Sequence, residues 1–175
     1  MKKIYLAGPE VFLPDAEDIF EKRKKISLSY GYLAVTPFDN SLDSEIKGIE
    51  RARKIFEANK NLILNSDYII ANCNPFRSAI VDDGTSFEIG FGFANKKKIY
   101  GFCSKKISLP EIVKNKIQTK PHESGYEIDN DGYLVNEDFG NTINLMLEFS
   151  ILESGGKLIE GSYEDAIKEL AESSS

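Results

Sequence analysis

The sequence of 175 residues has no tryptophan, one histidine and two cysteines. Cys73 and Cys103 each end an apolar run, which is typical of a buried, reduced thiol, so we expect neither a disulfide nor a zinc site. The histidine, His122, lies in a polar loop region. A Ser-His-Asp or Cys-His catalytic system would depend on this one residue, and we exclude hydrolysis of that type.

Long apolar runs and the usual phosphate-binding motifs are also missing. Residues 1–7 are a charged start followed at once by a short predicted strand, with no segment suited to a signal peptide or a membrane span. We expect a cytoplasmic protein that does not bind membranes. There is no G-x-x-x-x-G-K-S/T sequence and no G-x-G-x-x-G after the first strand, so nucleoside triphosphates and dinucleotides lack their usual cradle.

The chain has a negative net charge, with 22 Lys and Arg against 28 Asp and Glu, and its lysines form only short runs such as 96–98. Without an extended basic face it is a poor partner for a nucleic-acid polymer. Hydrophobic residues make up 41% and charged residues 29%, the composition of an ordinary globular protein. A chain of this length forms one sizeable core, so we predict a single domain over residues 1–175.

Short apolar or β-branched runs alternate with longer segments of helical period, which predicts an α/β fold with a mostly parallel sheet. We predict strands at 4–7, 32–36, 68–71, 99–102 and 157–159, and helices at about 14–30, 48–64, 85–95, 141–153 and 163–170. Residues 104–139 are polar and turn-rich. A loop of this length is usually functional or partly disordered, so we place a lid or a subunit contact there.

Polar and aromatic residues gather where the predicted strands end. In an open, doubly wound sheet, ligands bind outside the carboxyl ends of the strands. Gly-Pro-Glu-Val-Phe at 8–12 follows the first strand, Phe-Asp-Asn at 38–40 the second, and Asn72 with Pro-Phe-Arg at 75–77 the third; the next helix opens with 82–88. These segments would supply carboxylates, amides and aromatic rings to one small-molecule pocket.

Glu88 has two interpretations. Thr85 and Glu88 have the spacing of a capping box, in which the glutamate only satisfies a backbone amide at the helix start. However, Gly90 and Gly92 follow in the same helix, where each glycine costs about 1 kcal/mol relative to alanine and suggests close approach of another backbone or a ligand. The helix dipole would also favour the ionised carboxylate that a nucleophile needs. Glu88 is therefore a candidate nucleophile as well as a candidate cap.

A metal ion is the other chemistry that this acidic segment could support. Asp82, Asp83 and Glu88 could together hold magnesium. Aspartates at the start of a helix are more often caps, so we expect no metal.

Five ordered segments of the sequence resemble the motifs of nucleoside 2-deoxyribosyltransferases, from the first strand to about Leu147. They are 5–12 (YLAGPEVF), 66–72 (SDYIIAN), 75–77 (PFR), 82–90 (DDGTSFEIG) and 144–147 (NLML). Each is weak alone, but their order and spacing are specific. The resemblance implies a flavodoxin-like doubly wound sheet of five mainly parallel strands, and dimer-based homo-oligomers whose active sites borrow residues from a neighbouring subunit.

The resemblance also implies a reaction on 2'-deoxynucleosides and free bases without a cofactor. Glu88 matches the nucleophile, which attacks C1' of the sugar and forms a covalent deoxyribosyl ester that a second base displaces. Asp82 matches an aspartate that binds a sugar hydroxyl or helps proton exchange with the base, and Tyr5 matches a tyrosine that orients the glutamate. Asn144 and Met146 match a pair donated across the dimer to the 5' side of the sugar.

The remaining binding residues follow from the resemblance by approximate position. The expected substrate-binding residues are Gly8, Phe12, Asp39, Asn59, Asn72, Phe76 and Arg77. Asn72 departs from the family, because some members carry an aspartate there as a proton donor and an amide can only form hydrogen bonds. The leaving base would then take its proton through Asp82, Asp39 or water.

Two other functions remain open at this point. The first is a 2'-deoxynucleoside 5'-monophosphate N-glycosidase, in which water replaces the second base. Glu10, in the loop after the first strand, would repel its phosphate, and Asn144 in place of a serine favours a free 5'-hydroxyl. The second is a non-catalytic nucleoside-binding module, in which Glu88 is only a helix cap. The sequence favours the transferase, acting in nucleoside salvage.

Overall fold

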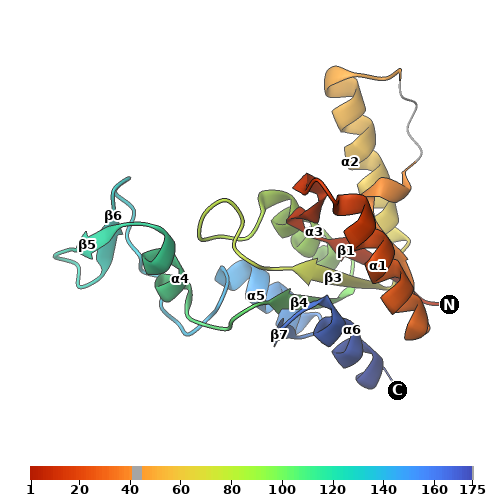
Figure 1. Ribbon diagram of the computed structural model, residues 1–175. Helices are drawn as coiled ribbons and strands as arrows, with labels where there is room; N and C mark the ends of the chain where they lie inside the picture. The colour runs from red at the N-terminus through yellow and green to blue at the C-terminus, as the bar shows by residue number, and fades with distance from the viewer. Residues whose placement is uncertain (41–44, 175) are drawn as a thin grey trace.

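A sheet of five strands forms the centre of the computed structural model, which describes residues 1–40 and 45–174 (Figure 1). Its strands are β1 (Lys3–Ala7), β2 (Leu33–Val35), β3 (Tyr68–Asn72), β4 (Lys98–Cys103) and β7 (Leu158–Glu160). They lie in the order β2-β1-β3-β4-β7, and every neighbouring pair is parallel. This is the flavodoxin-like order, so the predicted α/β class and five-stranded sheet are confirmed.

Helices cover both faces of this sheet. α1 (Ala16–Ser29) and α6 (Tyr163–Glu172) pack on one face, and α2 (Gly48–Leu64), α3 (Asp83–Ala94) and α5 (Leu145–Glu153) on the other. Successive side chains of a strand point to opposite faces. In β1, Ile4 and Leu6 therefore join the core under α1 and α6, whereas Tyr5 and Ala7 join the core under α2, α3 and α5. No helix in the described ranges is long and apolar enough to cross a membrane.

Most predicted boundaries agree with the structure to within two residues, and α5 is the exception. This helix begins at Leu145 rather than at residue 141, because Asn144 is its N-cap and the Asn144 side-chain oxygen accepts a hydrogen bond from the Met146 amide at 3.1 Å. Two short 3-10 helices, η1 (Pro9–Phe12) and η2 (Pro37–Asp39), follow β1 and β2. They bring both loops to the carboxyl edge of the sheet.

Residues 104–139 contain regular structure where the sequence predicted a long loop. They form helix α4 (Leu109–Lys116) and an antiparallel strand pair, β5 (Thr119–Pro121) and β6 (Glu127–Asp129). The Ser108 side chain caps α4 by accepting from the Glu111 amide, and Pro110 lies in the first turn, where helices tolerate proline. Lys114 pairs with Glu127 of β6 at 2.9 Å. Figure 1 shows this unit extending away from the sheet and from α2.

Both cysteines are buried and free. Cys73 directly follows β3, and Cys103 ends β4. Burial raises the pKa of both thiols, that of Cys103 to about 11, so both are protonated at neutral pH.

Candidate active site

A pocket of about 480 Å³ lies at the carboxyl ends of β1 and β2, against the start of α3. The strand order reverses here, since β1 pairs with β2 on one side and with β3 on the other, and doubly wound sheets bind ligands at such a point. Among its lining residues are five that the sequence predicted: Gly8, Phe12, Asn59, Asp82 and Glu88. No described residue of 104–139 lines it, so within one chain that segment is not a wall of the pocket.

Asp82, and not Thr85, caps helix α3. The Asp82 Oδ2 atom accepts hydrogen bonds from the Thr85 backbone amide at 2.8 Å and from the Thr85 hydroxyl at 3.0 Å. The helix therefore begins at Asp83, and Thr85 is already inside it. The capping-box interpretation of Thr85 and Glu88 is wrong, because the backbone amide that a cap satisfies is taken by Asp82. In the described part of the chain, no cluster of three or more His, Cys, Asp or Glu is arranged to hold a metal ion.

The Glu88 carboxylate accepts a hydrogen bond from the Tyr5 hydroxyl at Oε1. Tyr5 is fully buried in β1 and projects toward α3, on which Glu88 lies. Burial raises the pKa of Tyr5 above its usual value, so the phenol keeps its proton and acts as the donor. The strand alternation of β1 thus fixes one carboxylate oxygen of Glu88 at the pocket.

Burial raises the pKa of Glu88 to about 7, which is opposite to the effect that the sequence predicted from the helix dipole. The negative charge of Asp82 raises it further, and the Tyr5 hydrogen bond lowers it. The dipole acts mainly within the first turn, whereas Glu88 is the sixth residue of α3. Near neutral pH, Glu88 is present in both protonation states.

Phe12, Phe76 and Arg77 form a stack at the edge of the pocket. The rings of Phe12 and Phe76 are stacked with centroids 5.3 Å apart, and the Arg77 guanidinium lies over both rings, 5.2 Å and 4.7 Å from their centroids. Arg77 has a positive φ of 54°, which is uncommon for a residue other than glycine. Phe12 lines the pocket, while Phe76 and Arg77 support it from outside the wall.

Asp39 and Asn72, like Phe76 and Arg77, were predicted to bind substrate and do not line the pocket. Asp39 Oδ2 accepts from the Thr36 amide at 2.7 Å, and Oδ1 pairs with Lys24 at 2.5 Å. The Asn72 amide nitrogen donates to Glu10 at 2.6 Å, and its oxygen accepts from the Asn74 amide at 3.0 Å. Both side chains use their polar atoms to hold loops in place.

Glu10 is buried instead of facing a ligand. Its Oε1 atom accepts from Arg23 of α1 at 2.5 Å as well as from Asn72. A Cβ at Gly8 would lie 2.0 Å from Glu10 Oε2. A glycine at position 8 therefore leaves room for the buried Glu10 carboxylate beside the pocket. Because Arg23 compensates the charge of Glu10, the predicted repulsion of a phosphate by Glu10 loses its basis.

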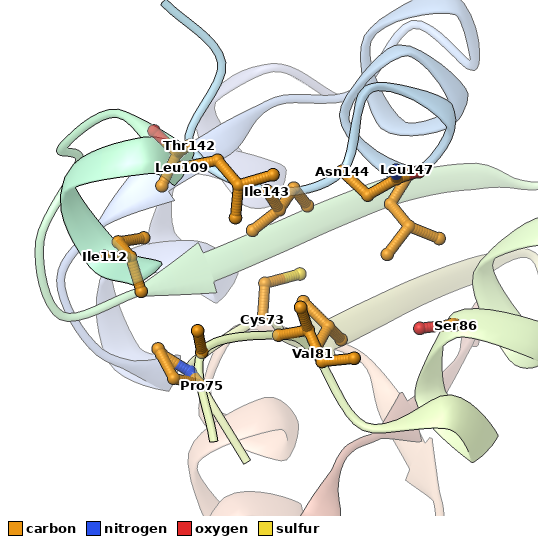
Figure 2. Close-up of a pocket in the computed structure, with 12 residues that line it drawn as sticks. Cys73, Pro75, Val81, Ser86, Leu109, Ile112, Thr142, Ile143, Asn144 and Leu147 are labelled. Carbon is orange, nitrogen blue, oxygen red and sulfur yellow. The ribbon is translucent and has the colours of Figure 1, made fainter. Parts of the chain in front are cut away.

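Asn144 and Met146 lie away from this pocket, at the start of α5. Figure 2 shows Asn144 and Leu147 across from Cys73 and Val81 at a second, mainly apolar pocket of about 260 Å³. Met146 is 68% exposed. Neither Asn144 nor Met146 contributes to the Glu88 pocket of its own chain.

The structure adds lining residues that the sequence analysis missed. These are Arg51 and Ile55 of α2, which line the pocket with Asn59. Phe38 and Asn40 also line it near η2, in the segment 38–40 that the sequence predicted at this edge. Residues 51, 55 and 59 are four apart, so they share one helix face. That spacing was visible in the sequence once Asn59 was considered.

Comparisons with known proteins agree with one another. The family described as nucleoside 2-deoxyribosyltransferase matches residues 4–146. An uncharacterized protein of Schizosaccharomyces pombe is 33% identical, covering 96% of this chain and 88% of its own length. The structure of a 2-desoxiribosyltransferase from Leishmania mexicana has a TM-score of 0.69 and 29% identity over 98% of both chains. A conserved protein from Enterococcus faecalis V583, 18% identical over 99% of both chains with a TM-score of 0.66, shares the fold.

Proposed function

Because the chain belongs to the nucleoside 2-deoxyribosyltransferase family, we propose that it exchanges the base of 2'-deoxynucleosides through a covalent deoxyribosyl ester on Glu88. The carrying observation is the hydrogen bond from Tyr5 to Glu88 at the wall of the pocket. A glutamate that only capped α3 would bond backbone amides. Glu88 instead faces a cavity of about 480 Å³, which is in the size range of small-molecule sites.

In the first half of the proposed reaction, a Glu88 oxygen forms a bond to C1' of the sugar. The bond between C1' and the base nitrogen breaks, and its electron pair leaves with the base, which takes up a proton. Tyr5 holds Oε1, so Oε2 is the oxygen that reaches C1'. The ionised fraction of Glu88 is the nucleophile.

In the second half, a nitrogen of the acceptor base attacks C1' and the ester bond to Glu88 breaks. The carboxylate is regenerated, and the acceptor nitrogen loses its proton. Each displacement inverts C1', so the product keeps the configuration of the donor. In a hydrolase, water would take the place of the acceptor base in this step.

Asp82 is the proposed proton carrier for the bases. It lines the pocket beside Glu88, and its Oδ2 atom is occupied by Thr85. Oδ1 is the oxygen that we assign to the sugar hydroxyl or to a base proton. Asp39 does not line the pocket, so of the proton routes considered Asp82 and water remain.

A second copy of the chain completes the proposed site. Asn144 is exposed at the start of α5 and Met146 is 68% exposed, as expected for side chains that reach a neighbouring molecule. Phe56, Phe87 and Phe149, on the same side of the sheet, are each about half exposed. We propose that these helices meet in a homo-oligomer and that Asn144 and Met146 contact the sugar in the partner's site.

An exchange assay tests the proposed function. The protein is incubated with deoxyinosine or thymidine, with and without adenine, and free base and new nucleoside are measured. We expect new nucleoside only when adenine is present. Release of base without exchange would indicate a hydrolase. No turnover of any donor would indicate a binding module. Either result would overturn the proposed transferase activity.

A further inference from the structure

The pocket has a second polar region, opposite in charge to the one around Glu88. Asp82, Asp83 and Glu88 lie at the start of α3. Arg51 and Asn59, two turns apart on α2, line the pocket from another wall, with Ile55 between them. When C1' of a nucleoside lies at Glu88, the base extends from C1' toward another wall of the pocket.

The α2 wall presents hydrogen-bond donors. The guanidinium of Arg51 has N–H donors and no acceptor. One of its nitrogens, Nη1, donates to the Ile46 carbonyl at 3.4 Å, and the residue lines the pocket. The Asn59 side-chain oxygen accepts from the Asn40 amide nitrogen at 2.9 Å, so the NH₂ group of Asn59 is what a ligand can meet. Asp39, which the sequence analysis placed among the substrate-binding residues, is bonded to Lys24 and Thr36 outside the pocket.

The walls around these donors are suited to a flat ring. Val11 and Phe12 come from η1, and Pro37 and Phe38 from η2. Phe12 is held by its stack with Phe76 and Arg77. Bases bind between such apolar surfaces and are distinguished by the hydrogen bonds at their edges.

We propose that Arg51 and Asn59 select bases that present a carbonyl oxygen at the edge away from the sugar, so that 6-oxopurines are preferred over 6-aminopurines. The inference rests on the proposed function and adds its substrate class. The O6 and N7 atoms of a 6-oxopurine are both acceptors and match N–H donors of a guanidinium. Adenine has an amino group in place of O6. Its N–H donor would face the N–H donors of Arg51 and Asn59, and no hydrogen bond could form between them.

The test compares two donor nucleosides in two variants of one helix. Arg51→Gln removes the guanidinium, and Arg53→Gln is the matched control, because Arg53 is exposed on the same helix and does not line the pocket. We measure kcat/KM for deoxyinosine and for deoxyadenosine with a common acceptor base. Arg51→Gln should lower the ratio of deoxyinosine to deoxyadenosine about tenfold or more, and Arg53→Gln should leave it within about twofold.

Binding of free hypoxanthine and adenine to the Glu88→Ala protein, measured by calorimetry, separates this inference from the reaction. Tighter binding of hypoxanthine, lost when Arg51→Gln is added, supports the inference even if no donor is turned over. An unchanged ratio in Arg51→Gln, or an equal loss for both donors, overturns it. A preference for deoxyinosine 5'-monophosphate over deoxyinosine that disappears in Arg51→Gln also overturns it, because Arg51 would then bind a phosphate.

Discussion

Glu88 can meet a substrate because Asp82 takes the role of helix cap. Asp82 and Thr85 are both favoured cap residues and lie three positions apart. The sequence therefore identified the acidic segment but could not divide the roles within it. The division depends on where α3 begins, which is fixed by the bonds from Thr85 to Asp82.

Replacing Glu88 with alanine should lower the rate of base exchange at least about a thousandfold, because the variant lacks the atom that bonds C1'. The rate of product formation from deoxyinosine and adenine measures the loss. Glu123→Ala is the control, since Glu123 is an exposed residue in the turn between β5 and β6. Normal exchange by the Glu88 variant would exclude the covalent ester.

Replacing Tyr5 with phenylalanine should move the acidic limb of the pH profile upward. The Tyr5 hydrogen bond lowers the pKa of Glu88, which is about 7, so its loss raises that pKa. The ionised nucleophile then forms only at higher pH, and activity at pH 7 falls but recovers as the pH rises. kcat/KM measured from pH 5 to 9 reports this pKa in the free enzyme. Tyr133→Phe, at a tyrosine 73% exposed, should leave the limb in place.

Other residue roles depend on contacts that are distant in the sequence. Asn72 meets Glu10, which is 62 positions earlier, and Asp39 meets Lys24 of α1. A motif identifies the type of a residue but not the distant side chain to which that residue is hydrogen-bonded. For this reason the sequence could place Tyr5 and Glu88 near one edge of the sheet, yet it also placed Asp39 and Asn72 in a pocket that they do not line.

At the scale of elements, the two interior glycines of α3 differ. A Cβ at Gly92 would lie 2.2 Å from the Ile69 side chain of β3, whereas a Cβ at Gly90 would meet nothing within 4 Å. Gly92→Ala should therefore lower the free energy of unfolding by about 1 to 3 kcal/mol through overpacking. Gly90→Ala should raise it by up to about 1 kcal/mol, because alanine is the better helix former.

Denaturant unfolding of both glycine variants at one protein concentration measures the difference. The two substitutions add the same methyl group to the same helix, so each is a control for the other. Equal effects would show that Gly92 is not needed for the contact between α3 and β3.

The periodicity of the sequence predicted the five strands of the sheet and the five helices around them because each buries a regular apolar face. It failed for α4, β5 and β6, which are short and surrounded by polar residues. Ser108 and Pro110 are start signals for α4, but in a polar segment they are equally typical of a turn. The strand pair is held by contacts such as Lys114 with Glu127, which no local pattern shows.

For the whole molecule, Glu88 links catalysis to stability. Its pKa is about 7 in the folded chain and near 4.5 in the unfolded chain, so the folded state binds the proton more tightly. Stability contributed by this group is present below pH 4.5 and is lost as the pH rises to about 7. Glu88→Gln should therefore gain stability relative to the wild type, by about 3 kcal/mol between pH 4.5 and pH 8.

Unfolding by denaturant across this pH range, at a fixed protein concentration, measures the gain. Glu123→Gln, at an exposed site, should show no such trend. A difference between Glu88→Gln and wild type that stays constant with pH would mean that the pKa of Glu88 is not raised.

Mixing two inactive variants tests whether sites are shared between copies. One variant is Glu88→Ala, and the other carries both Asn144→Ala and Met146→Ala. If Asn144 and Met146 act in the partner's site, a hybrid dimer of these two variants has one site in which all three residues are wild type. Random mixing should restore about a quarter of the wild-type sites. Exchange activity after refolding the two variants together should exceed the sum of the separate activities. Simple addition would place Asn144 and Met146 outside the neighbouring site.

The sheet ends in β2 on one side and β7 on the other, and each of these strands has only three residues. Unpaired backbone groups at a sheet edge are templates for aggregation, and very short edge strands offer few of them. A concentrated solution of this protein therefore has little opportunity to join sheets into cross-β fibrils. Contacts between copies through sheet edges are therefore less favoured than contacts through the helices that cover the sheet.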